Sequence, residues 1–412
     1  MPPIGVCAQM LYTASLEDIR AGRITDVYFT RAREVLEAKG ASKRVTAELH
    51  CSSLPGGWSW GVLAGVEELA AALEGLPVNV DCAPEGSLFL CDEPVARISG
   101  DYAAFAEMET AMLGLLCQAS GIATRASRCR VAAGDRTLLS FGARRAHPSI
   151  APMIDRSCYL GGCDAVSVVH TAEMLGLEPS GTMPHALILV AGGLTTALQW
   201  FDEVVDESVP RVALVDTFCD EKFEAIAAAE TLGEKLAAVR LDTPGSRRGD
   251  WQALMREVRW ELDLRGYQHV EIFLSGGLDE YSIPRYNEFA SGYGVGTALS
   301  AAPPVNLAMD IVEIEGTAMT KRGKLSGVRN VAVCPACGTR TLFAEGRRPS
   351  DQCACGDRAQ TLLRPLIAGG EVVGELPGIE AIRSRCSQQL RAWTRAHPEA
   401  AGLTAGGGGY GA

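Results

Sequence analysis

Short apolar runs alternate with helix-type patterns through the central half of the chain. Each run is rich in β-type residues and most end in a glycine or a polar residue, with helical segments between them, the clearest at 220–237. The seven runs are 137–141, 163–167, 181–184, 212–215, 238–241, 269–274 and 293–295. Strands that alternate with helices favour a parallel sheet, so this α/β pattern predicts a seven-stranded (β/α) barrel.

The segments on either side of the barrel have a different pattern. Strands at 43–50 and 78–82 and helices at 30–39 and 62–73 predict a small α+β domain, and 102–130 reads as a core helix broken at Gly121. We predict four parts of the chain: an α+β domain at 1–125 completed by strands at about 305–332, the barrel at 126–304, a cysteine-bearing segment and helix at 333–398, and a disordered tail at 399–412.

Polar residues follow most of the predicted barrel strands. The carboxyl ends of barrel strands share one face, so these residues should converge there. The candidates are Arg144, Arg145, His185, Asp216 and Asp242. One aspartate after a strand usually caps the next helix, but capping alone does not explain several acids, two arginines and a histidine at equivalent positions.

Two glycine turns are predicted to lie side by side at this face. One is Ser275-Gly276-Gly277, and the other ends in Gly296-Thr297. Bare amides at two such turns could form a phosphate cup, although on the glycines alone two tight turns with positive φ are the simpler interpretation. Asp279 and Glu280 follow where a helix dipole would help most, so the amides and hydroxyls would have to bind the anion.

Charge and composition limit the class of protein. The 412 residues include 38 basic and 50 acidic side chains without a long basic run, which argues against nucleic acid as a main partner. The longest apolar runs are too short to span a bilayer, and no targeting segment is evident. We therefore expect a soluble cytoplasmic protein with no membrane partner.

Four of the fourteen cysteines form two close pairs. They are Cys334, Cys337, Cys353 and Cys355, within one glycine-rich, hairpin-like segment. Two thiolate pairs at this spacing suit a closed tetrahedral Zn²⁺ site that stabilises the fold and performs no chemistry. The second pair is C-x-C, and vestigial cysteines are the alternative.

The order of the strand-exit motifs resembles that of the nicotinate phosphoribosyltransferases, in particular the shorter, archaeal-type branch with a cysteine-bearing C-terminal segment. The resemblance covers roughly residues 28–355, and the order of motifs is more specific than any one of them. The motifs are Phe141-Gly142-Ala143-Arg144-Arg145, Gly161-Gly162-Cys163-Asp164, Gly181-Thr182-Met183-Pro184-His185, Leu214-Val215-Asp216-Thr217-Phe218, Arg240-Leu241-Asp242-Thr243-Pro244, Ser275-Gly276-Gly277 and Gly294-Val295-Gly296-Thr297.

The resemblance implies a fold, a reaction and an assembly. The fold is an incomplete seven-stranded α/β barrel with a flanking α+β domain, and the active site is shared within a homodimer or higher homo-oligomer. The reaction joins nicotinate to phosphoribosyl pyrophosphate with coupled hydrolysis of ATP, in NAD salvage. Mg²⁺ would accompany ATP and phosphoribosyl pyrophosphate.

The same resemblance assigns roles to residues. His185 would be phosphorylated by ATP, making the chain a phosphoprotein, and Asp216 and Asp242 would hold ribose hydroxyls directly or through Mg²⁺. The remaining expected substrate contacts are the ring partners Phe141 and, from the partner subunit, Tyr28; the arginines Arg144, Arg145 and Arg240; Asp164 at the base pocket; and Ser275, Gly276, Gly277, Gly296 and Thr297 on the 5′-phosphate.

Several alternatives stay open. Ala165 and Ala186 stand where the resemblance leads us to expect glycine and a polar residue, which affects base specificity and ATP coupling. The other possible activities are quinolinate phosphoribosyltransferase, a relative acting on another pyridine or aromatic acid, and a non-catalytic paralogue that binds pyridine nucleotides. Arg247-Arg248 and the basic turn 321–324 could each contact an anion or be solvated.

Overall fold

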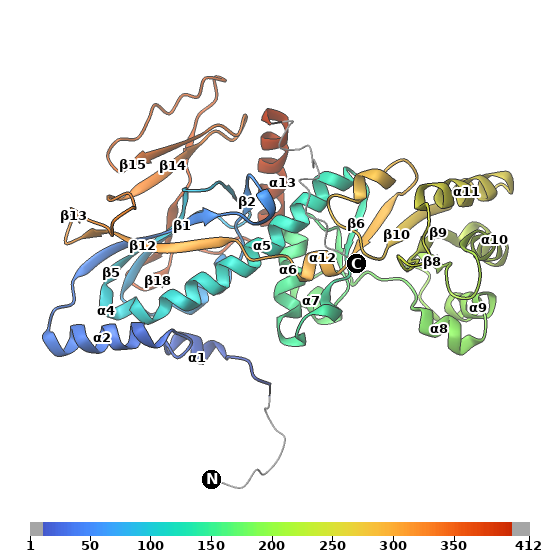
Figure 1. Ribbon diagram of the computed structural model, residues 1–412, viewed down its shortest axis with the longest axis horizontal. Coiled ribbons are helices and arrows are strands. Elements are labelled where there is room, and N and C mark those ends of the chain that lie inside the picture. The colour runs from blue at the N-terminus through green and yellow to red at the C-terminus, as the bar shows by residue number, and fades with distance from the viewer. Residues whose placement is uncertain (1–10, 398–412) are drawn as a thin grey trace, which may run out of the picture.

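The computed structural model of the chain describes residues 11–397. The molecule is elongated, with an antiparallel sheet at one end, a parallel sheet toward the other, and the long helix α5 (Glu109–Ala133) running between them (Figure 1). Within the described residues, no helix is long and apolar enough to cross a membrane.

The antiparallel sheet joins segments from both ends of the chain. Its strand order is β13-β12-β1-β5-β3-β17-β18. The bounds are β1 (Arg44–Ser53), β3 (Val78–Cys82), β5 (Pro94–Asp101), β12 (Asn306–Ile314), β13 (Thr317–Ala318), β17 (Arg364–Ala368) and β18 (Glu371–Val372). Because β12 pairs with β1, with Met309 opposite Leu49, the predicted return of the chain to this sheet is confirmed.

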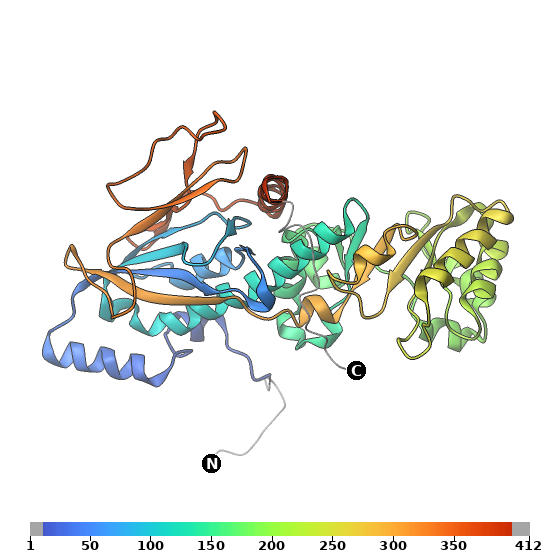
Figure 2. The same cartoon turned by 45° about the horizontal axis from the view of Figure 1, so that its top comes forward.

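Helices and a small two-stranded sheet complete this end of the molecule. The helices are α1 (Leu16–Arg20), α2 (Val27–Lys39), α3 (Val66–Leu73) and α4 (Tyr102–Phe105), and the sheet pairs β2 (Gly61–Val62) antiparallel with β4 (Leu88–Phe89). In both views α2 lies at the outer edge, far from the parallel sheet (Figures 1 and 2).

The parallel sheet is curled into a half-barrel. Its order is β7-β6-β11-β10-β9-β8, with parallel pairing throughout. The bounds are β6 (Thr137–Ser140), β7 (Ala165–Val166), β8 (Arg211–Leu214), β9 (Leu236–Leu241), β10 (Glu271–Ser275) and β11 (Gly292–Val295). The sheet is open between β7 and β8, which lie at its two edges.

The predicted seventh strand, 181–184, is wrong. Within residues 11–397 the parallel sheet has six strands, and this stretch is coil that leads directly into α8 (His185–Ala191). Pro184 has no N–H to give to a ladder and instead takes the extended conformation of the residue that precedes a helix. The segment therefore lies in the connection that spans the open side of the half-barrel.

Helices surround the half-barrel and cover its outer face. They are α6 (Ala151–Leu160), α7 (Val169–Leu175), α8, α9 (Leu194–Val204), α10 (Glu221–Leu232), α11 (Trp251–Leu264) and the short α12 (Thr297–Ser300). The clearest helical prediction, 220–237, corresponds to α10 followed by β9. The core between helices and sheet is aliphatic, with Ile154, Val239 and Val258 fully buried.

Helix α5 is continuous through Gly121, so the predicted break there is wrong. A Cβ on Gly121 would lie 2.3 Å from the carbonyl oxygen of Pro303, and the glycine is therefore required by the close approach of another chain segment. Met112 and Leu116 of α5 belong to the core of the antiparallel sheet, while Ile122 and Ala126 belong to the core of the half-barrel. The helix thus joins the two cores.

The C-terminal segment adds a third sheet and a long helix. Strands β14 (Arg329–Val333), β15 (Arg340–Ala344) and β16 (Gln360–Thr361) pair antiparallel, and α13 (Ile379–Ala396) packs between this sheet and the half-barrel (Figure 2). The predicted disordered tail, 399–412, lies outside the described residues.

Candidate active site

An open cavity of about 930 Å³ lies at the carboxyl ends of the parallel strands. This is the face at which the sequence predicts convergence. The lining residues are Phe141, Ala143, Arg144, Arg145, Ser167, Thr182, Met183, Pro184, His185, Ala186, Arg240, Asp242, Pro244, Ser275, Gly276, Gly277, Gly294, Gly296 and Thr297. Most of the predicted site residues are therefore together in one cavity.

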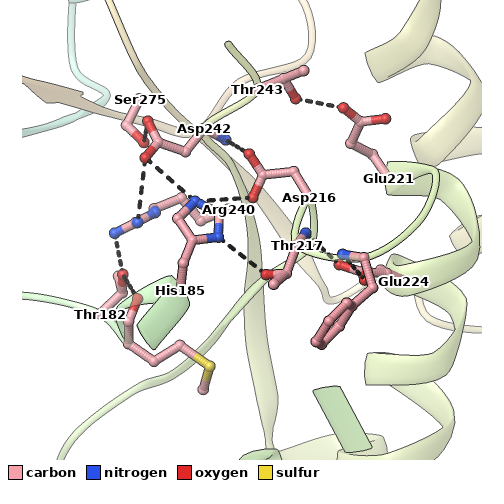
Figure 3. A network of polar contacts seen from close by, with 12 residues as sticks. Thr182, His185, Asp216, Thr217, Glu221, Glu224, Arg240, Asp242, Thr243 and Ser275 are labelled. Carbon is pink, nitrogen blue, oxygen red and sulfur yellow. Dashed lines mark hydrogen bonds and ion pairs between the residues drawn. The ribbon is translucent and has the colours of Figure 1, made fainter. Parts of the chain in front are cut away.

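His185 is the first residue of α8, and its ring faces the strand exits. Its Nδ1 lies 3.0 Å from Oγ1 of Thr217, and its Nε2 lies 3.6 Å from Asp216 Oδ1 and 3.9 Å from Asp242 Oδ2 (Figure 3). The side chain is 39% exposed, so a molecule in the cavity can reach it. The imidazole is thus held by a hydroxyl on one nitrogen and faces two carboxylates with the other.

Asp216 is the buried member of this group. Its side chain is only 2% exposed, and burial, with the nearby Asp242 carboxylate as a smaller contribution, raises its pKa to about 6. Oδ2 accepts a hydrogen bond from the Asp242 amide (3.1 Å), while Oδ1 is buried without a hydrogen-bond partner among the described residues. A buried carboxylate oxygen in this state is suited to a ligand hydroxyl or a cation.

Acidic residues in the first turn of α10 fix the loops that carry these groups. Glu224 accepts hydrogen bonds from the amides of Thr217 (2.9 Å), Phe218 (2.9 Å) and Cys219 (3.2 Å), and Glu221 accepts one from Thr243 Oγ1 (2.5 Å). Neither glutamate was predicted from the sequence, because acids in a first helical turn ordinarily complement the helix dipole.

Arg240 lies at the centre of the cavity, on β9. It donates to Oγ1 of Thr182, its guanidinium lies 3.7 Å from Asp242 Oδ2, and it lies 5.8 Å from the centre of the Phe141 ring. Burial lowers the pKa of Arg240 from its ordinary value, yet an arginine remains charged under these conditions. The sequence does not predict the contact of Arg240 with Thr182, because its pattern predicts a strand at 181–184.

The glycine turns bring backbone close to functional side chains. Gly276 and Gly277 have φ of +93° and +70°, and Ser275 Oγ donates to Asp242 Oδ1 (3.0 Å). A Cβ on Gly294 would lie 2.3 Å from the Phe141 ring, so only glycine allows that ring to lie against β11. The first turn thus has the positive φ of a tight turn, whereas Gly296 in the second has φ of −105°, and both turns line the cavity.

Two side chains near the turns act within the fold. Arg248 donates to the carbonyls of Thr243 (2.9 Å) and Gly276 (2.6 Å) and stacks on Trp251 (3.8 Å), which ties its loop to the glycine turn. Glu280 is fully buried and forms ion pairs with Arg125 and Arg128 of α5. Glu280 therefore does not oppose an anion at the turn, contrary to the concern raised by its position in the sequence.

Two predicted site residues lie elsewhere in the structure. Asp164 precedes β7 and so lies at the amino end of that strand, away from the strand exits, where it forms ion pairs with Arg130 (2.6 Å) and Arg383 (2.9 Å) and accepts from the Leu138 amide. It does not line the cavity, so its assignment to the base pocket is not supported by its position. Tyr28 is 58% exposed on α2, at the other end of the molecule (Figure 1).

The four paired cysteines meet as predicted. Their sulfur atoms all lie within 4.8 Å of one another, with Sγ–Sγ separations of 3.5 Å for Cys334 and Cys355 and for Cys337 and Cys353. Four thiolates about 2.3 Å from a tetrahedral Zn²⁺ are separated by about 3.8 Å, so the donor set fits this ion.

Comparison with known proteins gives two matches to protein families. Models described as quinolinate phosphoribosyl transferase, N-terminal and C-terminal domain, match residues 26–120 and 122–310. A nicotinate phosphoribosyltransferase of Mycobacterium tuberculosis is 29% identical over 417 residues, covering 90% of this chain and 91% of that protein. One of Bacillus subtilis is 32% identical over 242 residues, covering 56% of this chain and 48% of that protein.

Solved structures of related proteins match this chain over most of its length. A nicotinate-nucleotide pyrophosphorylase from Pyrococcus furiosus is 50% identical and superposes with a TM-score of 0.92, covering 94% of this chain and 99% of that one. Human nicotinic acid phosphoribosyltransferase is 19% identical, with a TM-score of 0.72 and coverage of 92% and 95%, which shows the shared fold.

Proposed function

This chain belongs to the nicotinate phosphoribosyltransferase family, and from that premise we propose that it joins nicotinate to phosphoribosyl pyrophosphate, with coupled ATP hydrolysis. The products are nicotinate mononucleotide and pyrophosphate, which places the enzyme in NAD salvage. The observation that carries the proposal is the convergence of His185, Asp216 and Asp242, with His185 Nε2 within 3.9 Å of both acids, beside the two glycine turns.

The substrate's ribose 5′-phosphate binds at the glycine turns. The backbone of Gly276, Gly277 and Gly296 and the hydroxyls of Ser275 and Thr297 border the cavity there. Amides with no side chain beside them can approach phosphate oxygens closely, and the buried ion pairs of Glu280 leave that acid neutralised. This end of the cavity therefore sets the position of the sugar.

Asp216 and Asp242 hold the ribose hydroxyls, directly or through Mg²⁺. Carboxylate oxygens are preferred ligands of that ion, and the unpartnered Oδ1 of Asp216 supports such a role. Mg²⁺ would neutralise the charge of the pyrophosphate leaving group. The two carboxylates also place negative potential beside the ribose carbon, which becomes cationic as the pyrophosphate bond ionises.

The base binds between the ring of Phe141 and the arginines at the mouth of the cavity. Arg144 and Arg145 are exposed there and offer forked donors to the nicotinate carboxylate and to pyrophosphate oxygens, while Arg240 lies deeper. Tyr28 completes the ring sandwich from the partner subunit of a homodimer, because in its own chain it lies too far away (Figure 1).

His185 accepts the γ-phosphoryl group of ATP on Nε2. The Nε2–P bond forms as the P–O bond to the leaving ADP breaks, and hydrolysis of the phosphohistidine later returns the free imidazole. Thr217 Oγ1 beside Nδ1 holds the ring so that Nε2 faces the cavity. Neutralisation of the two carboxylates by a cation or a proton would remove the repulsion that a phosphoryl group meets there.

We further propose a structural Zn²⁺ on Cys334, Cys337, Cys353 and Cys355, and the domain division given by the sequence. The α+β domain is 1–125 with 305–332, the catalytic half-barrel is 126–304, and the zinc-bearing segment with its helix is 333–398. The separate cores at the two ends of α5 and the cysteine geometry support these assignments.

An endpoint assay tests the reaction. Purified protein is given phosphoribosyl pyrophosphate with nicotinate, nicotinamide or quinolinate, each with and without ATP–Mg²⁺, and the mononucleotide is detected by mass. We expect product from nicotinate only, with a higher yield when ATP is present. Absence of product from all three bases would contradict the proposed activity and favour a binding role.

Quinolinate is the second candidate substrate, because the matched family models carry that name. Its second carboxylate would need further cations around the base, whereas the cavity lining offers Arg144, Arg145 and Arg240. Product from quinolinate without ATP, together with CO₂, would establish this activity instead.

The variant His185→Ala tests the ATP coupling separately. It should lose the stimulation by ATP and keep a slow transfer, because the contacts to ribose and base come from other residues. Full stimulation by ATP in this variant would exclude His185 as the phosphorylated residue. His147, which borders a turn at the cavity mouth but is not among the lining residues, supplies the matched control His147→Ala.

A further inference from the structure

A second cavity, of about 280 Å³, lies far from the strand exits, in the C-terminal segment. It is enclosed by the sheet of β14 and β16, the start of β17, the turn before β4 and one face of α13. None of its lining residues belongs to the proposed active site. Its volume is close to the lower end of the range of about 300–1,000 Å³ that is common for small-molecule sites.

The Asp, Glu, Lys and Arg side chains that line this cavity are all basic, and Cys334 of the proposed zinc cluster also borders it. The lining includes Arg340, Arg364 and Arg385, while the described lining residues include no aspartate or glutamate. This is unusual on a chain with a formal net charge of −12. A cluster of one sign with no acid in the lining creates a local potential that attracts anions.

The three arginines differ in how far the fold already uses them. Arg340 forms a bidentate ion pair with Glu93, with contacts of 2.7–3.0 Å. Arg385 donates one N–H to the Glu85 carbonyl (2.6 Å), and Arg364 donates one to Gln360 Oε1 (2.9 Å). Arg364 and Arg385 therefore keep further N–H donors for a ligand, since a guanidinium has five.

Arg364 and Arg385 also lie close enough to repel each other. The pKa of Arg385 is lowered from its ordinary value, first by burial and then by the charge of Arg364. Two guanidinium groups at one cavity without a shared acid resemble the arrangement that binds a carboxylate or a phosphate. An anion between them would relieve this repulsion.

The rest of the wall is mostly apolar. Pro84, Leu88, Val333, Leu362 and Trp393 contribute to it, and the amide side chains of Gln388 and Gln389 lie at the cavity on α13. A bare inorganic ion would leave this apolar surface without contact. The lining suits a ligand with a ring-like body and one acidic group.

We propose that this cavity is a binding site for a small organic anion, whose ring lies against the apolar wall and whose carboxylate or phosphate is held by Arg364 and Arg385. The site is separate from the proposed active site and does not depend on the proposed reaction. Helix α13 touches both regions, because Arg383 on it donates to the carbonyls of Tyr159 and Cys163 beside the half-barrel.

The test is a ¹⁹F NMR titration of the full chain with two separate probes, 4-fluorobenzoate and 4-fluorophenyl phosphate. The comparison of the two shows whether the acidic group is a carboxylate or a phosphate. We expect at least one probe to bind, and its affinity to fall at least tenfold in the double variant Arg364→Gln/Arg385→Gln. Arg391→Gln is the matched control, because Arg391 is exposed on the same helix and does not line the cavity.

Two further variants keep the result unambiguous. Arg240→Gln alters the proposed active site, so binding at the second cavity should survive in it. If the double variant does not fold, the single variant Arg364→Gln suffices, since Arg364 is exposed and makes one side-chain hydrogen bond. Failure of both probes to bind the wild type, or equal affinity in the wild type and Arg364→Gln, would overturn the proposal.

Discussion

Asp216 shows how one buried side chain links the stability of this protein to its proposed chemistry. The carboxylate is held at a strand exit with one oxygen unpartnered, and burial raises its pKa to about 6 from 3.8. Between these two pH values the native state keeps a proton that the unfolded chain has lost. Asp216 therefore lowers stability as the pH rises through about 6, and this cost is fully present at neutral pH.

The variant Asp216→Asn should accordingly be more stable and less active. We expect a gain of about 1–2 kcal/mol in the free energy of unfolding at neutral pH, after allowance for water in the open cavity, and no gain at about pH 4. The transfer rate should fall by roughly 100-fold or more, since the charge beside the ribose is lost. Denaturant unfolding at both pH values and a rate assay measure these changes; equal gains at both would contradict the burial argument.

Among the elements, β6 and β11 are the pair on which the base pocket depends. They are parallel neighbours, with Gly294 opposite Leu139, and the ring of Phe141 at the end of β6 lies directly against Gly294. The absence of a Cβ at Gly294 of β11 thus allows the aromatic ring that follows β6 to occupy this place. This contact connects sheet register to substrate binding.

Gly294→Ala should displace the Phe141 ring. The new Cβ would lie 2.3 Å from ring carbons, which costs about 1–3 kcal/mol of stability and should raise KM for nicotinate roughly tenfold or more. KM for phosphoribosyl pyrophosphate should change less, because the proposed ribose contacts, Asp216 and Asp242, follow β8 and β9, and only the Gly296-Thr297 part of the phosphate site follows β11. Gly114→Ala is the control, since a Cβ there meets nothing within 4 Å. Equal increases in the KM values for nicotinate and phosphoribosyl pyrophosphate would contradict a specific role of Phe141 in binding the base.

The sequence predicts the elements well where apolar periodicity decides the structure. Six parallel strands and the return of β12 to the first sheet follow from it, as does the meeting of the polar exits. It fails where a contact distant in sequence decides. The close approach of Pro303 explains the glycine at 121 inside a continuous helix, and ion pairs with Arg130 and Arg383 hold Asp164 at the amino end of β7, away from the cavity.

Residues that support the site are the hardest to predict. Thr217 and Glu224 look like ordinary residues of a helix start, and only the folded loop shows that one contacts His185 and the other fixes the loop amides. The position of Thr217 next to the predicted site residue Asp216 is a sequence signal that could have identified it as a site residue. Nothing local distinguishes Glu224 from other acids near helix N-termini.

At the scale of the whole molecule, the proposed zinc site stabilises the C-terminal segment of the chain. Replacing Cys337 by Ser should remove the metal and lower Tm by several degrees, because a closed tetrathiolate site contributes directly to folding free energy. Metal analysis and thermal unfolding are the measurements. Cys91→Ser, an exposed cysteine outside the cluster, should change neither. A wild type without bound zinc would remove this proposal.

The position of Tyr28 has a consequence for the assembly. It is exposed on α2, at the far end of the molecule from His185 and Asp242, so it can enter a cavity only if that cavity belongs to another copy of the chain (Figures 1 and 2). Homo-oligomers with closed symmetry repeat such a contact at each site. Two inactive variants, one altered at Tyr28 and one altered in the cavity, should then complement each other within a mixed oligomer.

Tyr28→Ala and Asp242→Asn should each be nearly inactive alone, and active when mixed within one dimer. In the mixed dimer one cavity receives both lesions and the other receives neither, so random pairing should restore about a quarter of wild-type activity. Phe141→Ala mixed with Asp242→Asn is the control, because both lesions lie in the chain's own cavity and every site keeps one. The measurement is the transfer rate after co-expression, with mixed dimers confirmed by native mass spectrometry. If mixed dimers form without recovery of activity, Tyr28 does not reach the partner's cavity, and each chain's site must be complete without it.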